Sequence, residues 1–259
     1  MRCNYHNHTY RCGHASGTEE EYIKKAISEG IRVLGFSDHT PYIFPGSFVS
    51  YCRMDISQIG DYFSTLVALR EKYRGYIDIK IGFEAEYYPR YFPSLLEEYR
   101  KYPLDYLIYA GHYIGHEGAE DCFCAFDATD SPCRLSAYTD MTIAAMQTGR
   151  FSMLAHPDMM HFVGDPDLYR QEAARLVREA KRLGIPLEIN LNGIRDRRYY
   201  PNPAFWEVAG ALGADAFLGF DAHMVRHVAD RGEILEGMRF ADKYGVNLLD
   251  EVELKNPLF

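Results

Sequence analysis

Seven short apolar segments recur along this 259-residue chain, and helix-like stretches separate them. Short apolar segments bounded by turn residues are typical of buried strands. Strands that alternate with helices favour a parallel sheet, because parallel neighbours need a long crossover connection. The seven segments are residues 2–8, 32–38, 77–86, 106–113, 152–157, 187–192 and 216–223.

Helix boundaries can be read at several places. Thr18 followed three residues later by Glu21 predicts an N-terminal capping box, and Gly30 predicts the end of that helix. Three more helical stretches end at a glycine: 167–183, 204–212 and 231–244. Seven strand–helix units are one fewer than a TIM barrel contains. We therefore expect an α/β fold, a distorted (β/α)7 TIM-like barrel, as a single domain over residues 1–259.

Composition and charge argue against several classes of protein. Hydrophobic residues make up 47% of the chain, which is ordinary for a globular protein. There is no apolar run of ~18 residues and no apolar core of a signal peptide, so we expect a cytoplasmic protein without membrane contact. A formal net charge of −9 without a Lys/Arg-rich run argues against nucleic-acid binding. The six cysteines are too sparse for a disulfide scaffold, and we expect reduced thiols.

Side chains that can bind metal ions stand at the carboxyl ends of the predicted strands, where parallel barrels hold their active sites. They are His6, His8, His14, Asp38, His39, Glu84, Glu86, His112, His156, Asp221 and His223. Acids and histidines are costly to bury unless they are paired or bind a metal, and six strands deliver them to one rim. The joint pattern predicts a multinuclear metal site.

Strand geometry narrows the choice of ligands only in part. Residues i and i+2 point to the same side of a strand, so His6 and His8 can meet one ion. Asp38 and His39 are adjacent and point to opposite faces, so only one of them is expected to contact an ion. Spacing alone does not choose between the two glutamates at 84 and 86.

Short motifs at these strand ends resemble those of the polymerase-and-histidinol-phosphatase (PHP) superfamily, in the order that the family shows. They are HNHT (6–9) with CGHA (12–15), GFSDHT (35–40), GFEAE (82–86), GHY (111–113), AHPD (155–158) and DAH (221–223). The resemblance spans residues 4–225. Within the superfamily, the neighbourhoods of 38–41 and 82–86 look most like those of histidinol-phosphate phosphatases.

The resemblance implies three divalent ions, with zinc, manganese or iron as candidates. It implies that one ion is bound by His6, His8, Glu84 and Asp221, a second by Glu84, His112 and His156, and a third by His14, His39 and His223. It thereby selects Glu84 over Glu86 and His39 over Asp38. Asp38 then becomes a hydrogen-bond partner of a metal-bound imidazole.

The activity that the resemblance implies is hydrolysis of a small phosphate monoester, in the first place L-histidinol phosphate, as a step of histidine biosynthesis. Glu84 and Asp221 are the implied catalytic carboxylates, with Asp38 in support. Arg195 matches the arginine expected after the sixth strand, where a planar bidentate donor suits phosphate.

The chain departs from the family pattern after the fifth strand. Histidinol phosphatases usually carry a basic residue there, whereas residues 151–169 contain no Lys or Arg. His161 stands near that place, and we predict that it contacts phosphate or protonates the leaving alkoxide. Asp158 is predicted to orient a ligand or the substrate.

Three alternatives stay open. The chain could be a PHP phosphoesterase for another small metabolite, such as a nucleotide or sugar phosphate. It could be an exonuclease, which would need a basic groove, or a non-catalytic metal-binding module, which would be expected to have lost ligands. Two long connections, 41–54 and 115–134, are expected to carry substrate contacts, with the second as a candidate lid. The oligomeric state is open.

Overall fold

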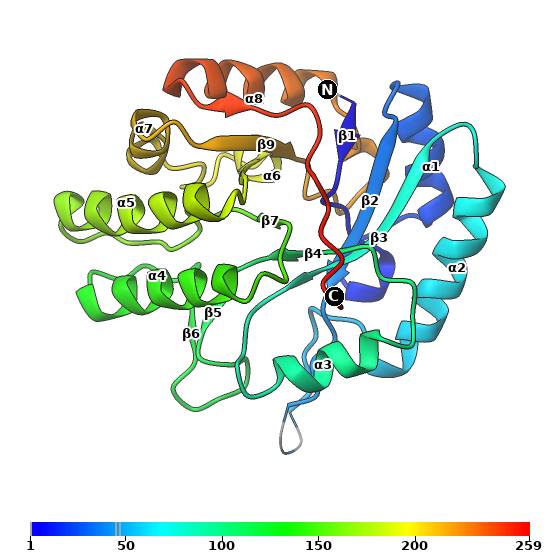
Figure 1. Cartoon of the computed structure of the whole chain (residues 1–259), viewed down its shortest axis with the longest axis horizontal. Helices are drawn as coiled ribbons and strands as arrows, with labels where there is room; N and C mark the ends of the chain where they lie inside the picture. Colours follow the sequence, from blue (N-terminus) through cyan, green and yellow to red (C-terminus); the bar gives the residue numbers. More distant parts are fainter. Residues whose placement is uncertain (1, 45, 47) are drawn as a thin grey trace.

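The structure, a computed structural model, describes residues 2–44, 46 and 48–259. Within these residues, eight strands form one parallel sheet in the order β1-β2-β3-β4-β7-β8-β9-β10 (Figure 1). The strands are β1 (Cys3–Asn4), β2 (Val33–His39), β3 (Asp78–Ala85), β4 (Tyr106–Tyr109), β7 (Met153–Leu154), β8 (Leu187–Asn190), β9 (Asp215–Gly219) and β10 (Asn247–Leu248).

The sheet closes on itself at its carboxyl rim. A parallel bridge between Asn7 and Ala222 joins the chain beyond β1 to the chain beyond β9. The seven strands from β1 to β9 therefore form a ring, and β10 pairs with β9 outside it. The prediction of a distorted (β/α)7 barrel is confirmed, and β10 is an addition that the sequence analysis did not predict.

Helices lie around the outside of the strands (Figure 1). They are α1 (Glu19–Ser28), α2 (Ile59–Lys72), α3 (Phe92–Tyr99), α4 (Pro132–Gln147), α5 (Pro166–Leu183), α6 (Leu191–Arg195), α7 (Pro203–Ala211) and α8 (Arg231–Tyr244), with 3-10 turns η1 (Tyr10–Cys12), η2 (Ile56–Gln58) and η3 (Val225–His227). Thr18 and Glu21 form the predicted capping box of α1. Among the described helices, none is long and apolar enough to cross a membrane.

The two long connections are partly ordered by local structure. β5 (Tyr113–Ile114) and β6 (Phe123–Cys124) form an antiparallel hairpin that occupies much of the 115–134 connection. In the 41–54 connection, residues 45 and 47 lie outside the described residues. All six cysteines are free thiols, as predicted.

Alternation along the strands sorts side chains into an outer core and an inner core. On β3, Ile79, Ile81 and Phe83 belong to the large cluster shared with the surrounding helices. Gly82 and Glu84 alternate with them and face the barrel interior, where β-strand geometry places every second residue. The interior positions nearest the carboxyl end of a strand therefore point into the mouth of the barrel.

Tyr106 fills the middle of the barrel interior. Its hydroxyl donates a hydrogen bond to the carbonyl oxygen of Tyr5 at 2.6 Å. Gly35 on β2 and Gly82 on β3 leave room for this ring, because an added Cβ would lie 2.2 Å and 2.6 Å from Tyr106 atoms. A close approach of this kind requires glycine at both positions.

The C-terminal segment closes the amino-terminal end of the barrel. After β10 it runs across the strands (red in Figure 1), and Val252 joins the inner core. Arg150, which precedes β7, donates to the carbonyl oxygen of Pro257 at 2.8 Å. With this end covered, the barrel opens at the carboxyl ends of its strands.

Gly82→Ala tests the inner packing. The new methyl group must displace Tyr106, and overpacking of this kind costs about 1–3 kcal/mol of unfolding free energy. Urea denaturation of the two proteins at equal metal content measures the difference. Gly60→Ala in α2 is the matched control, because its nearest neighbouring atom is 3.9 Å away and alanine favours helix. Equal midpoints for Gly82→Ala and wild type would contradict the packing argument.

Candidate active site

A cavity of about 780 Å³ opens at the carboxyl ends of the strands. Seven of the predicted metal ligands line it: His14, His39, Glu84, His112, His156, Asp221 and His223. The other two, His6 and His8, are fully buried and lie against Glu84 and Asp221. Residues that span more than 200 positions of sequence thus converge on one place.

The buried carboxylate of Glu84 lies at the centre of this group. Its Oε1 is 2.8 Å from Nε2 of His156 and 3.5 Å from Nε2 of His112. Its Oε2 is 2.9 Å from Nδ1 of His39 and 3.6 Å from Nε2 of His8. A carboxylate placed between imidazoles on two sides has the geometry of a group that can bridge two cations.

Asp221 is a second carboxylate in this group, and it contacts His6 and His8. Its Oδ1 lies 3.1 Å from Nε2 of His8 and 3.6 Å from Nε2 of His6. Its Oδ2 accepts hydrogen bonds from the side-chain amides of Asn190 (3.2 Å) and Asn192 (3.0 Å). The two amides leave Oδ1 directed at the histidines.

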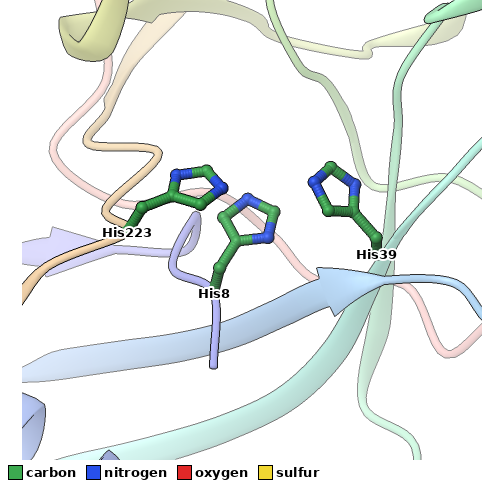
Figure 2. A group of neighbouring side chains, drawn as sticks. All are labelled: His8, His39 and His223. Carbon is green, nitrogen blue, oxygen red and sulfur yellow. The ribbon is translucent and has the colours of Figure 1, made fainter. Parts of the chain in front are cut away.

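Three rings from separate parts of the chain face a common space. Figure 2 shows His39, the last residue of β2, with His8 and His223, which lie in the segments that follow β1 and β9. The rings of His8 and His223 stack with centroids 4.0 Å apart, and those of His8 and His39 are 4.4 Å apart. Ring nitrogens of all three lie within 4.8 Å of one another, close enough to meet one ion.

The pair of His14 and His223 provides a chemical test of whether a cation fits here. Nδ1 of each ring lies 3.0 Å from a backbone carbonyl oxygen, that of Cys12 for His14 and that of Asp221 for His223. A carbonyl oxygen only accepts, so each Nδ1 carries the ring proton and each Nε2 presents a lone pair. The two Nε2 atoms are nevertheless 3.0 Å apart.

Two lone pairs at that distance repel each other unless a positive charge lies beside them. A proton is a poor candidate, because burial and the charge of His8 lower the pKa of both His14 and His223. Neutral imidazole nitrogens are instead good ligands for divalent metals. The donor set therefore fits a metal ion.

Carboxylates behind the ligands orient two of the imidazoles. Nδ1 of His6 donates to Oε1 of Glu188 at 2.6 Å, and Nδ1 of His112 donates to Oε1 of Glu86 at 2.7 Å. Such bonds fix the tautomer and aim Nε2 at the metal. The sequence analysis did not find Glu188, although it is an acid on an interior position of a buried strand. It named Glu86 without finding its role.

The electrostatics of the group follow from burial and from mutual pairing. Burial opposes ionisation of Glu84, yet the imidazoles of His6, His112 and His39 hold its pKa well below the usual value. Burial lowers the pKa of His39 to about 4. For His8, burial is offset by bonds to Asp221 and Asp38, and its pKa rises to about 9. Divalent cations bind ionised carboxylates and neutral imidazoles, so a metal ion bound here would displace the proton that His8 holds.

Backbone strain is concentrated at two of these residues. His156 has a φ of 26° and Asp221 a φ of 46°, both in the left-handed region that non-glycine residues seldom adopt. Strained residues of this kind cluster at functional sites. Both follow a strand end, where the strain turns the side chain into the cavity.

Asp38 lies beside His8, and its supporting role stays a prediction. Its carboxylate accepts hydrogen bonds from the backbone N–H and the hydroxyl of Thr9, and it lies 3.6 Å from Nδ1 of His8. His39, its neighbour, faces the interior and contacts Glu84. Strand alternation separates the two, as expected.

Asp158 and His161 do not line the cavity, so the structure does not bring them together with the other predicted site residues. Asp158 is buried and accepts hydrogen bonds from the backbone of Asn202 and the indole of Trp206, so it anchors the start of α7. His161 stacks on Tyr199 with ring centroids 4.0 Å apart. Both are absent from the described residues that line the cavity, because the turn after His156 carries them outward.

Arg195 does line the cavity, but its guanidinium is already engaged. Nη2 donates to Oδ1 of Asn192 at 2.6 Å, and Nη1 donates to Oε2 of Glu233 at 3.1 Å. Its Nε is buried without a hydrogen-bond partner. Arg198 and Arg226, which the sequence analysis did not select, line the same side.

Comparisons with known proteins agree with this architecture. The PHP domain family matches residues 4–192. A Deinococcus radiodurans protein named "Probable histidinol-phosphatase" is 30% identical over 93% of this chain and 90% of its own length. The histidinol-phosphatase of Bacillus subtilis is 27% identical over 45% of this chain and 46% of its own length.

The fold is also found among solved structures. A crystal structure of histidinol phosphate phosphatase from Lactococcus lactis, complexed with zinc, L-histidinol and phosphate, superposes with a TM-score of 0.71. It shares 21% identity and covers 96% of this chain and 95% of that one. The family match covers most of the chain, and a relative at 30% identity extends along nearly all of it. The chain therefore belongs to the PHP domain family.

Proposed function

We propose that this protein is a metal-dependent phosphatase that hydrolyses L-histidinol phosphate to L-histidinol and phosphate. The observation that carries the proposal is the convergence of nine candidate ligands on the cavity, eight of them buried or half-buried, with the lone pairs of His14 and His223 facing each other. Membership of the PHP domain family and the names of the similar proteins support the choice of substrate.

The proposed ligand sets are those that the resemblance to the PHP superfamily implies. His6, His8, Glu84 and Asp221 would hold one ion; Glu84, His112 and His156 a second; His14, His39 and His223 a third. Zinc is the first candidate, since the similar Lactococcus lactis enzyme is complexed with it, and manganese and iron suit the same donors. Ions bound there supply an acidified water and neutralise charge on phosphoryl oxygens.

Charge explains how an acidic protein attracts an anionic substrate. Three divalent ions would bring +6, which the ligands Glu84 and Asp221 reduce to about +4. Arg195, Arg198 and Arg226 line one side of the cavity and add positive charge there. We propose that these arginines hold the phosphate, in place of a basic residue after His156.

The direct test is phosphate release from L-histidinol phosphate by protein of measured metal content. A kcat near ~10 s⁻¹ with kcat/KM of at least ~10⁴ M⁻¹s⁻¹ is the expected result for a natural substrate. A metal-loaded protein that releases no phosphate from it would overturn the substrate assignment.

A second candidate function is hydrolysis of another small phosphate ester, such as a nucleotide or sugar phosphate. The absence of Lys and Arg from residues 151–169, together with the position of His161 outside the cavity, favours it. A panel of phosphorylated metabolites at equal concentration separates the two: the preferred substrate is the one with the highest kcat/KM.

Glu84→Gln tests the metal assignment. The substitution keeps the volume but removes the charge shared by the surrounding imidazoles. We expect bound metal to fall and kcat to drop by more than the ~10–100-fold typical of losing an outer partner of a metal ligand. Elemental analysis and phosphate release measure both. Glu97→Gln, on the exposed side of α3, is the control, and full metal content in Glu84→Gln would refute the assignment.

Arg195→Ala tests the phosphate side of the cavity. Hydrogen bonds to charged groups contribute about 1.5–3 kcal/mol, so KM should rise about tenfold or more while metal content stays unchanged. Initial rates over a range of substrate concentrations give KM. The exposed neighbour Arg197, changed to alanine, should leave KM as in wild type. An unchanged KM in Arg195→Ala would remove this arginine from the phosphate site.

A further inference from the structure

Arg53 is a buried arginine at the edge of the cavity with an unusual set of partners. Its side chain is 3% exposed and lies between two buried carboxylates, those of Glu86 and Glu117. Nη1 and Nη2 donate to the two oxygens of Glu86 at 2.9 Å and 2.5 Å, and Nε donates to Glu117 at 2.7 Å. Nη1 also donates to the carbonyl oxygen of Thr40 at 3.2 Å.

These four bonds use four of the five N–H groups of the guanidinium. Arg53 is therefore not free to grip an anionic substrate in the way proposed for the arginines on the opposite wall. Its two forked bonds instead define the position of both oxygens of Glu86, since planar bidentate pairs are geometrically specific.

Glu86 connects Arg53 to the metal ligands. Oε1 of Glu86 accepts the bond from Nδ1 of His112 at 2.7 Å, and Nε2 of His112 lies 3.5 Å from Glu84. The orientation of the His112 ring, and with it the direction of Nε2, thus depends on the position of Glu86. The position of Glu86 in turn depends on Arg53.

Arg53 also removes an electrostatic conflict. Glu84, near the end of β3, and Glu86, directly after that strand, are both 1% exposed. A second unpaired carboxylate there would be costly to bury and would be free to turn toward the cations itself. The charge of Arg53 pairs with Glu86 and keeps it behind His112.

Glu117 fixes the far side of the guanidinium. It belongs to the 115–134 connection, and its Oε1 also accepts a hydrogen bond from the hydroxyl of Ser50 at 2.8 Å. Arg53 and Ser50 both belong to the 41–54 connection. The two connections are therefore tied together where Arg53 is held, which keeps its side chain in one orientation.

We infer that Arg53 is a positioning residue of the metal centre, acting through Glu86 to direct His112. The inference rests on the proposed function in one respect, the assignment of His112 as a ligand. It concerns the geometry of the centre and does not depend on which phosphate ester is the substrate.

The test compares wild type, Arg53→Gln and Arg53→Lys as full-length, zinc-loaded proteins. A chromophoric chelator titrated into each reports the dissociation constant of the most weakly held zinc. Losing an outer partner of a ligand typically costs about 10–100-fold in metal affinity, so we expect Arg53→Gln to weaken that constant by this factor. Arg53→Lys should recover only part of the loss, because one ammonium cannot bond both oxygens of Glu86 in the forked geometry.

Kinetics distinguish positioning from substrate binding. Once saturating zinc is supplied, kcat of Arg53→Gln should remain lower than that of wild type while KM changes less than about threefold. In the Glu86→Gln background, adding Arg53→Gln should cost little more, since residues that act through one another are not additive. Arg70→Gln, which breaks an arginine–aspartate pair outside the site, controls for loss of a paired arginine.

Wild-type zinc affinity and kcat in Arg53→Gln would overturn the inference, as would a rise in KM alone. If Arg53→Gln does not fold, as judged by circular dichroism, Arg53→Lys decides by the same two measurements. A wild type that holds zinc but hydrolyses no ester would refute the proposed function, while the zinc titration would still decide the role of Arg53.

Discussion

A carboxylate buried among imidazoles is the constraint on which the rest of the site depends. Glu84 is 1% exposed, and five histidines have a ring nitrogen within about 3.6 Å of its oxygens. The free-energy cost of burying an isolated ionised carboxylate there would exceed the net free energy of folding of a typical domain. The strand ends must therefore bring partners to it, and the barrel does so by directing the interior face of successive strands toward one rim.

The histidines also need defined tautomers, and groups behind four of them supply this. An acceptor for the N–H of an imidazole fixes the tautomer in which the other nitrogen presents its lone pair to the cavity. Glu188 and Glu86 fill this role for His6 and His112, and backbone carbonyl oxygens do so for His14 and His223. Glu188 also shapes the fold, because a Cβ on Gly219 of the adjacent strand would lie 1.6 Å from its Oε1. Because Gly219 has no side chain, it leaves room for this carboxylate.

The cavity has different chemistry on its two sides. On the side of β8 and β9, arginines at 195, 198 and 226 reach the cavity. On the side of β3 and β4, Arg53 is the cationic side chain among the described residues that line the cavity, and two carboxylates pair with its charge. An anionic group is thus favoured on one side, and the other side serves to hold the ligands in place.

Sequence patterning by itself determined the seven strand positions, the capping box of α1, and the ends of α5 and α8, because periodicity and capping are local properties of the chain. It also placed the candidate ligands at one rim, since strand ends in a parallel barrel meet there, whereas the choice of Glu84 over Glu86 and of His39 over Asp38 came from the resemblance to the PHP superfamily. Only the tertiary structure decided the places of Asp158 and His161, which the turn after β7 carries away from the cavity. The hydrogen bonds of Glu188 with His6 and of Arg53 with Glu86 are likewise known only from the tertiary structure. Those pairs join residues 182 and 33 positions apart, and the direction of a loop side chain follows from packing across the molecule rather than from its neighbours in sequence.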